Sequence, residues 1–484
     1  MKELVAEISK FETKVGLIED GELTEIFVER EENKRLVGNI YIGRVANILP
    51  GMESAFIDIG LEKNAFLYVD DLREFETKYL NGEINEKPIE ELLNVGDKVV
   101  VQILKGPRGT KGARVTTHFT IPGKYLILMP NNDYIAISKK ISKEEERNRL
   151  NKILRDIKPE GIGAIIRTAS KGQAKENFEK EIEYLIKKWN SVEEKIFTAK
   201  KGTVIYREDN IMERIFRDLY SMDIDYLVVN SEKKYWEMID YISAFSSKEN
   251  KMKVKLHSDG NIFDEYGITK ELNTALNKKV WLKCGGYLII EKTEALISID
   301  VNTGKNVGSM NLEETVFNTN IEAAKEIPRQ LRLRNLGGII IIDFIDMRLE
   351  KDKKELVATL EEYLKNDRIR NNVVHFTELG LIEMTRKRVG KELSSYFLEE
   401  CSHCDGFGYV KSKEVIINEL IKEIKELAKD EDITKLQIKA NPMICNYFNK
   451  NYKEIIKSYL NNKLIEVVSE KTMNLTETEI ILEK

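Results

Sequence analysis

The sequence lacks a disulfide framework, a long apolar run and a strong excess of charge of either sign. Four cysteines in 484 residues, of which only Cys401 and Cys404 are close together, fit a reducing compartment. No stretch approaches the roughly 18 consecutive apolar residues of a membrane-spanning helix, and the N-terminus carries acidic residues rather than an apolar leader. A net charge of −5 gives no overall basic field, so binding to nucleic acid depends on local patches. We therefore expect a cytoplasmic protein with no membrane segment.

The composition that remains is that of a large globular chain. At roughly 100 to 200 residues per domain, the length of 484 residues predicts several domains. A hydrophobic fraction of 42% supports packed cores, and a charged fraction of 33% indicates well-solvated surfaces. Segments typical of strands and of helices are mixed along the chain, so the expected fold class is α/β with several domains.

Two acidic residues end strand-like segments in the middle of the chain. Residues 286–300 predict two consecutive strands, the second of which ends at Asp300. Residues 311–334 predict a helix, and residues 338–343 predict an apolar strand that ends at Asp343. In such a βαβ unit the carboxyl ends of both strands lie at one edge of the sheet. Two carboxylates there repel each other unless a cation lies between them, and magnesium prefers such oxygen ligands. The chemistry that such a metal site supports is metal-assisted phosphodiester hydrolysis.

Other polar residues near this edge have predicted roles. Asn302 lies two residues after Asp300, on the same side of the strand if the strand continues, and is expected to orient water or phosphate. Nearby cations for a phosphate backbone are expected from Arg329, Arg332, Arg334 and Arg348. Asp346 lies beyond the strand end and is the less favoured ligand. The alternative is that the aspartates are helix caps or turn residues that follow buried strands.

Residues 37–118 predict a five-stranded barrel, because short strand-like runs alternate with Gly, Pro and charged turns. Aromatic and basic side chains share these runs and turns: Tyr41, Phe56, Phe66 and Tyr68 with Arg44, Lys63, Arg108, Lys111 and Arg114. In OB-folds, aromatic rings stack on bases while cations neutralise phosphates, so the set indicates single-strand binding. The alternative for any one aromatic is packing inside the barrel.

Two shorter motifs also suggest sites. Arg167 and Thr168 end an apolar run, and a guanidinium beside a hydroxyl suits a terminal phosphate, although an arginine in a surface salt bridge is the alternative. Cys401 and Cys404 offer two thiolates to one zinc ion, and a tetrahedral site is completed most simply by the same pair from a second chain. His403 as a ligand from the same chain, or a reduced or redox-active pair without metal, is the alternative.

The order and spacing of these motifs resemble the ribonuclease E/G family. The resemblance rests on residues 297–305 (ISIDVNTGK), 313–347 and 401–410 (CSHCDGFGYV), and extends from about residue 1 to residue 415. It implies an endoribonuclease that cuts single-stranded RNA with magnesium held by Asp300 and Asp343 and assisted by Asn302. It also implies a DNase-I-like catalytic subdomain at 279–399 and an RNase-H-like subdomain from 1–36 and 215–278, the latter expected to be structural.

The remaining segments also receive expected roles from the resemblance. Residues 37–118 resemble the OB-fold named after ribosomal protein S-one, in which Phe56, Phe66 and Lys111 are expected to contact RNA. Residues 119–214 are expected to form a subdomain that senses a 5′-monophosphate. The sensor residues implied are Gly123, Ile127, Arg167, Thr168 and Arg370.

Assembly and cellular role follow from the same resemblance. Residues 400–414 are expected to form a zinc link through Cys401 and Cys404 that joins protomers into homodimers or homotetramers, and residues 415–484 a small C-terminal α/β domain. The implied role is ribosomal RNA processing and messenger RNA decay, with preference for 5′-monophosphorylated RNA. By length, the chain is nearer to ribonuclease G than to the larger ribonuclease E proteins. The competing hypotheses are a non-catalytic RNA-binding scaffold or assembly factor, and a metal-dependent DNA nuclease, which a barrel for single strands serves poorly.

Overall fold

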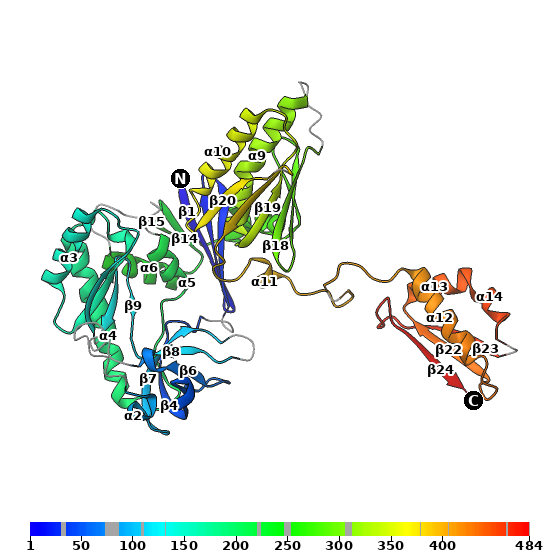
Figure 1. Cartoon of the computed structure of the whole chain (residues 1–484), viewed down its shortest axis with the longest axis horizontal. Helices are drawn as coiled ribbons and strands as arrows, with labels where there is room; N and C mark the ends of the chain where they lie inside the picture. Colours follow the sequence, from blue (N-terminus) through cyan, green and yellow to red (C-terminus); the bar gives the residue numbers. More distant parts are fainter. Residues whose placement is uncertain are drawn as a thin grey trace. The chain divides into compact units, whose positions relative to one another are not determined.

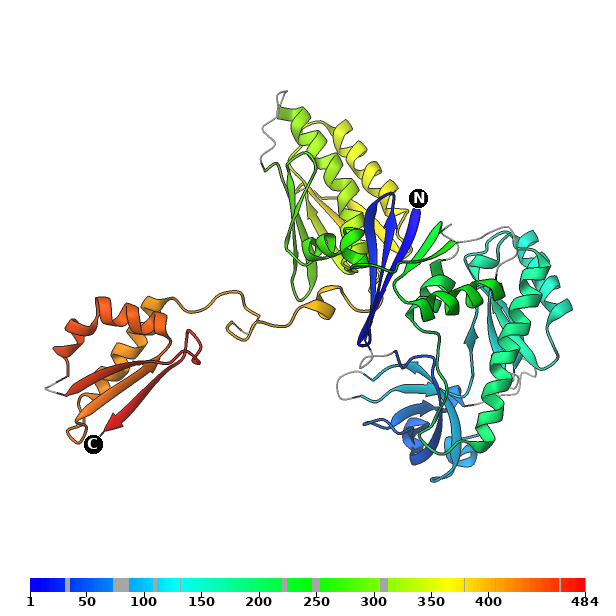
Figure 2. The same cartoon turned by 180° about the vertical axis from the view of Figure 1, so that it is seen from behind.

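A computed structural model of the chain contains two compact units, Met1–Tyr396 and Phe397–Lys484. It describes residues 1–30, 35–72, 87–107, 111–130, 132–219, 224–245, 253–304, 312–377, 379–404, 406–460 and 463–483. Four sheets belong to the first unit and one to the second within these segments. Figures 1 and 2 show both units from opposite sides. None of the helices in the described segments has the length and hydropathy needed to cross a bilayer.

The first sheet combines the N-terminus with strands that lie more than two hundred residues later. Its strands are β1 (Lys2–Ile8), β2 (Glu12–Glu19), β3 (Glu22–Arg30), β14 (Tyr226–Val229) and β15 (Lys253–Leu256), in the order β15-β14-β1-β2-β3. The turn between β2 and β3 has Asp20 and Gly21 at φ 51° and 86°, which fits the Asp-Gly turn signal. Helices α5 (Ile211–Leu219) and α6 (Glu232–Phe245) pack against this sheet, and α7 (Ile262–Glu265) and α8 (Ile268–Ala275) follow β15. The N-terminal hairpin is thus part of a larger mixed sheet (Figure 1).

The second sheet closes into the five-stranded barrel that the sequence predicts. Its strands are β4 (Ile40–Leu49), β5 (Ser54–Asp58), β6 (Ala65–Tyr68), β7 (Lys98–Lys105) and β8 (Arg114–Thr116). Their order is β4-β5-β6-β8-β7, and pairing of β4 with β7 closes the barrel, while β13 (Val204–Tyr206) adds to β4 from outside. Alternation on β5 and β6 buries Ala55, Ile57, Ala65 and Leu67 in the barrel core. Short helices occur at η2 (Pro50–Met52), η3 (Val69–Asp71) and α2 (Ile89–Leu92).

The third sheet follows the barrel in sequence. It consists of β9 (Ile121–Pro122), β10 (Leu126–Pro130), β11 (Asn132–Ile137) and β12 (Ile162–Ile166), in the order β11-β12-β10-β9. The segment also contains α3 (Glu144–Ile157), η4 (Thr168–Ser170) and the long helix α4 (Lys175–Thr198). One face of α4 buries Phe178, Leu185 and Trp189 in this core.

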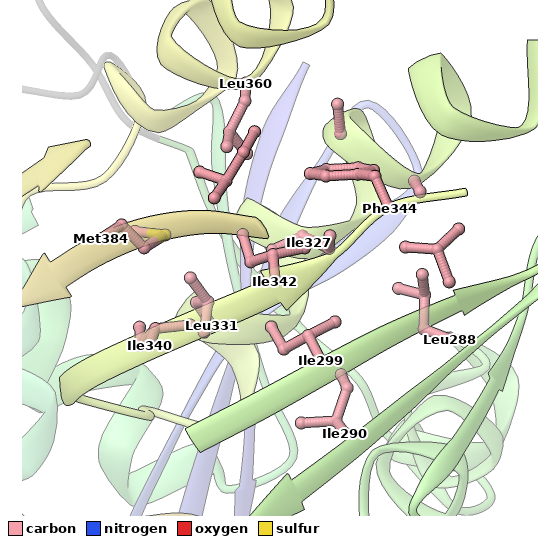
Figure 3. Packing of buried hydrophobic residues seen from close by; sticks show 14 of the residues in the cluster. Leu288, Ile290, Ile299, Ile327, Leu331, Ile340, Ile342, Phe344, Leu360 and Met384 are labelled. Atoms are coloured by element: carbon pink, nitrogen blue, oxygen red, sulfur yellow. The ribbon is translucent and has the colours of Figure 1, made fainter. Parts of the chain in front are cut away.

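The fourth sheet carries the predicted βαβ unit. Its strands are β16 (Lys279–Trp281), β17 (Tyr287–Lys292), β18 (Leu296–Asn302), β19 (Gly338–Asp343), β20 (Asn371–Phe376) and β21 (Leu381–Arg386), in the order β16-β17-β18-β19-β21-β20. Helix α9 (Leu312–Leu333) links the parallel strands β18 and β19, as predicted, and continues through Pro328. Residue 311, where the sequence predicts this helix to begin, lies outside the described residues. Together with α10 (Glu350–Leu364), α9 covers one face of the sheet, and Figure 3 shows Ile299 and Ile342 packed with Ile327, Leu331 and Leu360 of these helices.

The second unit is a small α/β domain. It contains α12 (Lys413–Leu427), β22 (Lys435–Ala440), α13 (Pro442–Asn451), α14 (Lys453–Lys457), β23 (Leu464–Ser469) and β24 (Thr478–Glu483), while α11 (Ser394–Phe397) lies at the boundary of the two units. The strands are ordered β23-β22-β24. Ser412 caps α12 by accepting a hydrogen bond from the Val415 amide. The second unit therefore contains both helices and strands.

Candidate functional site

The carboxylates of Asp300 and Asp343 lie on the open face of the fourth sheet. Alternation along β18 buries Ile299 at 1% exposure in the core beneath the helices and turns Asp300 to the other face. The same alternation on β19 buries Ile342 and exposes Asp343. The two aspartates are register partners on adjacent parallel strands, which lie ~4.8 Å apart. The structure therefore brings together the acidic pair that the sequence places at the ends of two separate strands.

The electrostatics of this pair suit a divalent cation. Burial, together with the negative charges of Asp300 and Asp346, raises the pKa of Asp343 above its usual range. A cation between the two carboxylates relieves this repulsion, and Mg²⁺ binds carboxylate oxygen while it keeps several waters. Among the described residues, no cluster of three or more His, Cys, Asp or Glu side chains has the geometry of a complete metal site. A magnesium ion here would therefore take its remaining ligands from water and phosphate.

Two asparagines hold this edge in place. Asn302 donates a hydrogen bond from Nδ2 to Oδ2 of Asp300 at 2.8 Å, which orients that carboxylate. Asn320, which is fully buried on α9, donates to the Ile345 carbonyl at 2.7 Å and accepts from the Ile345 amide at 3.1 Å. It thereby fixes the chain that follows Asp343. Sequence reasoning missed Asn320, although a polar residue on the apolar face of a predicted helix was an available signal.

The prediction that nearby arginines serve a phosphate backbone was wrong for three of the four. Arg329 binds Glu326, Glu271 and the Leu23 carbonyl. Arg332 is 7% exposed and pairs with Glu19 and Glu25, so these arginines tie α9 to the first sheet. Arg334 is buried and donates to the Gln330 side chain. Arg348 alone of the four is exposed, 3.7 Å from Glu313.

The barrel presents an aromatic cluster on its outer surface. Phe56 and Phe66 are register partners on β5 and β6 with ring centroids 5.5 Å apart, and Tyr68 lies 4.5 Å from Phe66. Arg114 stacks over Tyr68 at 4.7 Å and pairs with Asp71. Lys111 is exposed just before β8, and Arg108 lies outside the described residues. Tyr41, in contrast, is 3% exposed and packs inside the barrel, as the alternative interpretation of the aromatics expects.

Four of the five predicted phosphate-sensor residues lie on the strands of the third sheet or directly beside them. Arg167 donates to the Gly123 carbonyl at 2.6 Å and to Asp218 at 2.7 Å. The Thr168 hydroxyl lies 3.0 Å from that of Ser138, and Ile127 occupies β10 opposite Ile165 of β12. The fifth residue, Arg370, is exposed and precedes β20 of the fourth sheet.

A buried carboxylate supports this segment and was missed by sequence reasoning. Glu181, on the apolar face of α4, accepts hydrogen bonds from the amides of Lys124, Tyr125 and Leu126 at 2.5, 2.9 and 2.8 Å. Burial raises the pKa of Glu181 to about 7, although these three donors act in the opposite direction. Glu181 thereby fixes the turn that carries Gly123.

The cysteine pair forms an exposed turn in the second unit. The Cys404 amide donates to the Cys401 carbonyl at 3.3 Å, and the Gly408 amide donates to Sγ of Cys404 at 3.3 Å. Gly406 and Gly408 have positive φ of 78° and 82°, which permits this tight reversal. The turn holds two cysteines three residues apart, which is the spacing of half a tetrahedral zinc site. Cys445 is instead buried, with its thiol donating to the Ala440 carbonyl.

Comparison with known proteins extends over both units. The family model described as "Ribonuclease E/G family" matches residues 120–389, and the one described as "RNase E/G, Thioredoxin-like domain" matches residues 400–484. Ribonuclease G of Haemophilus influenzae is 41% identical over 448 residues, which cover 92% of this chain and 91% of that protein. Ribonuclease G of Escherichia coli is 41% identical over 449 residues, 91% of each chain. Ribonuclease E of a Nostoc species is 38% identical over 377 residues, 77% of this chain and 54% of that protein.

Proposed function

The chain belongs to the ribonuclease E/G family and is an endoribonuclease, and from this premise we propose that it cleaves single-stranded RNA with Mg²⁺ held by Asp300 and Asp343. The observation that carries the proposal is the register pairing of these two aspartates on one open face of the sheet. Neither carboxylate forms a salt bridge with a cationic side chain of the described residues. A divalent ion is the charge that this arrangement requires.

The residues around the pair have separable roles in the proposed reaction. When bound, magnesium polarises a phosphoryl oxygen and lowers the pKa of an attacking water. Asn302 keeps the Asp300 carboxylate in one orientation through its 2.8 Å hydrogen bond. Asn320 keeps the segment after Asp343 from shifting, so the spacing of the two carboxylates is preset before RNA binds.

The barrel is the proposed contact surface for the single strand. Phe56 and Phe66 lie on the outer face, where their rings are accessible for stacking on bases, and Lys111 supplies an exposed cation for phosphate. This combination distinguishes an RNA-processing enzyme from the DNA nuclease considered above, because duplex DNA offers no unstacked bases. The alternative of a scaffold without catalysis is disfavoured by the intact set of Asp300, Asp343 and Asn302.

A preference for 5′-monophosphorylated RNA is proposed from the cluster of Arg167, Thr168, Gly123 and Ile127, with Arg370 joining from another element. The guanidinium of Arg167 is already held by Gly123 and Asp218, so it is preoriented for a phosphate.

Cys401 and Cys404 are proposed to share one zinc ion with the same pair of a second chain, which makes a homodimer or a homotetramer. The proposed cellular role is ribosomal RNA processing and messenger RNA decay.

One assay tests this proposal. A short single-stranded RNA is prepared with a 5′-monophosphate or a 5′-hydroxyl, and a DNA strand of the same sequence serves as control. Mg²⁺-dependent cleavage of both RNAs, faster for the monophosphate and absent for DNA, is expected. Binding of RNA without cleavage at any Mg²⁺ concentration identifies a scaffold, and equal cleavage of DNA identifies a general nuclease.

A further inference from the structure

Three side chains form an aromatic and cationic cluster at the edge of the fourth sheet. Trp281 of β16 and Tyr287 of β17 have ring centroids 5.3 Å apart at an interplanar angle of 64°. Nζ of Lys279 lies 4.0 Å from the Trp281 centroid and 3.6 Å from the Tyr287 centroid. Trp281 is nevertheless 54% exposed, which is unusual for the largest apolar side chain. We refer to Lys279, Trp281 and Tyr287 as the edge cluster.

The edge cluster lies on the same face of the sheet as the two aspartates. Val280 and Leu288, at 2% and 0% exposure, point to the core beneath the helices, so their neighbours Trp281 and Tyr287 point to the open face. The register aligns Trp281 with Tyr287, and Tyr287 with Asn302. One row further along the strands, it aligns Lys279 with Ile289, and Ile289 with Asp300.

This alignment sets the distance between the cluster and the proposed scissile position. Two strand spacings separate the edge strand β16 from β18, which is roughly 10 Å. An RNA strand that crosses the open face of the sheet, with one phosphate at Asp300 and Asp343, would thus place a neighbouring base over Trp281. The open faces of β16, β17 and β18 form one continuous surface along this path.

We propose that Lys279, Trp281 and Tyr287 form a stacking subsite for a base of the RNA substrate next to the cleaved phosphodiester. The inference rests on the proposed function, because it takes the carboxylate pair as the cleavage site. Trp281 supplies the accessible aromatic surface, Tyr287 supports it from the neighbouring strand, and the Lys279 ammonium supplies positive charge for the phosphate beside the stacked base.

The charge of the cluster favours RNA over a protein partner as its occupant. A second protein chain seated on Trp281 would have to desolvate Lys279, which is costly without a buried carboxylate opposite it. A nucleotide offers both an aromatic face for the indole and a phosphate for the ammonium. Trp236 provides a comparison, since it is also exposed, at 57%, and also contacts a tyrosine, but it lies on helix α6 rather than on the catalytic sheet.

A binding experiment with abasic RNA tests the subsite. In an Asp300→Asn background, which prevents cleavage, the affinity for one RNA is compared with that for RNAs carrying a single abasic position near the cleavage point. One abasic position is expected to weaken binding about tenfold in the chain with Trp281 intact. Adding Trp281→Ala weakens binding to the complete RNA by a similar factor and abolishes the penalty at that position. Trp281→Phe keeps an aromatic face and most of the penalty.

Further variants, measured for RNA affinity in the same way, provide the control and the results that would contradict the subsite. Trp236→Ala leaves the abasic penalty unchanged. Lys279→Gln reduces the slope of log affinity against log salt by about 0.7, the value for one phosphate contact on a single strand. An abasic penalty that persists in Trp281→Ala overturns the proposal. The proposal is also overturned if Trp281→Ala changes the mass of the protein assembly in light scattering but leaves the RNA affinity unchanged, because that result would assign the cluster to a protein interface. Failure of the wild-type chain to cleave RNA would count against the proposed function itself, whichever way this binding test falls.

Discussion

Asn302 and Asp300 are joined by a 2.8 Å hydrogen bond between side chains two residues apart on β18, both on the open face of the sheet. The amide donor satisfies one carboxylate oxygen of Asp300 and fixes its direction relative to Asp343 on the next strand. The geometry of the acidic pair is therefore set by the strand register, by this contact and by the hydrogen bonds of Asn320 to the segment after Asp343.

Removal of that contact is expected to slow catalysis without abolishing it. Hydrogen bonds to charged groups contribute about 1.5 to 3 kcal/mol, so Asn302→Ala should lower kcat by about 10- to 100-fold and raise the Mg²⁺ concentration that gives half-maximal rate. Steady-state cleavage at a series of Mg²⁺ concentrations measures both effects. Ser298→Ala, on the same face of the same strand, serves as the control and should remain near wild type. Equal rates for Asn302→Ala and wild type would exclude the orienting role.

Glu181 predicts a pH-dependent difference in stability. The pKa of Glu181 in the folded chain is raised from 4.5 to about 7 by burial, so the folded state holds a proton that the unfolded state releases between these values. Its contribution to the free energy of unfolding is therefore largest at low pH and falls as pH rises from about 4.5 to about 7. Gln at this position does not titrate, and its NH₂ group faces backbone donors, so Glu181→Gln should be less stable than wild type.

The difference in melting temperature between wild type and Glu181→Gln should therefore be greatest near pH 5 and should narrow towards pH 8. Thermal unfolding across this range measures it. A difference that widens as pH rises would show that the three amide donors outweigh burial and lower the pKa of Glu181. Glu179→Gln on the exposed face of the same helix is the matched control and should show no such trend.

The cysteine turn predicts linked losses of metal and of assembly. Cys401→Ala removes one of the two thiolates that each chain would contribute to a shared tetrahedral site, so bound zinc and the larger assembly should be lost together. Elemental analysis and light scattering measure the two quantities. Cys284→Ala, which removes a half-buried thiol from the first unit, should change neither. Zinc retained at one ion per chain would instead favour a site completed within the chain.

The sequence predicted strands β18 and β19 because periodicity and chemistry agree there. Asp300 and Asp343 each follow a largely apolar run, and such runs are typical of buried parallel strands. The register between β18 and β19, in contrast, depends on how α9 packs, which the sequence alone does not specify. The closed barrel was predictable from regularly spaced short strands, but the burial of Tyr41 was not, since alternation alone does not say which face of a barrel strand is inside.

The features that sequence reasoning missed are tertiary. Arg329 and Arg332 lie on the helix that follows β18, and only the fold shows that they contact the first sheet. Arg334, just after the end of this helix, is buried and donates to Gln330. From the sequence, Glu181 resembles a surface residue of an amphipathic helix. Its burial follows from the turn at Lys124, whose amides donate to its carboxylate. Trp281 belongs to a strand of three residues, too short for a periodicity signal, and its place beside the acidic pair comes from cross-strand register.

Asp300 and Asp343 are proposed to hold together the ion that RNA cleavage requires. The most direct test is the single-turnover cleavage rate of Asp343→Asn at saturating RNA over a range of Mg²⁺, with Asp346→Asn, an exposed neighbour beyond the strand end, as control. Asp343→Asn should remove several kcal/mol of metal-assisted charge stabilisation, so its cleavage rate should be at least about a thousandfold lower. RNA affinity should be retained, and Asp346→Asn should still be active. Wild-type rates in Asp343→Asn, or equal losses in both variants, would contradict the claim.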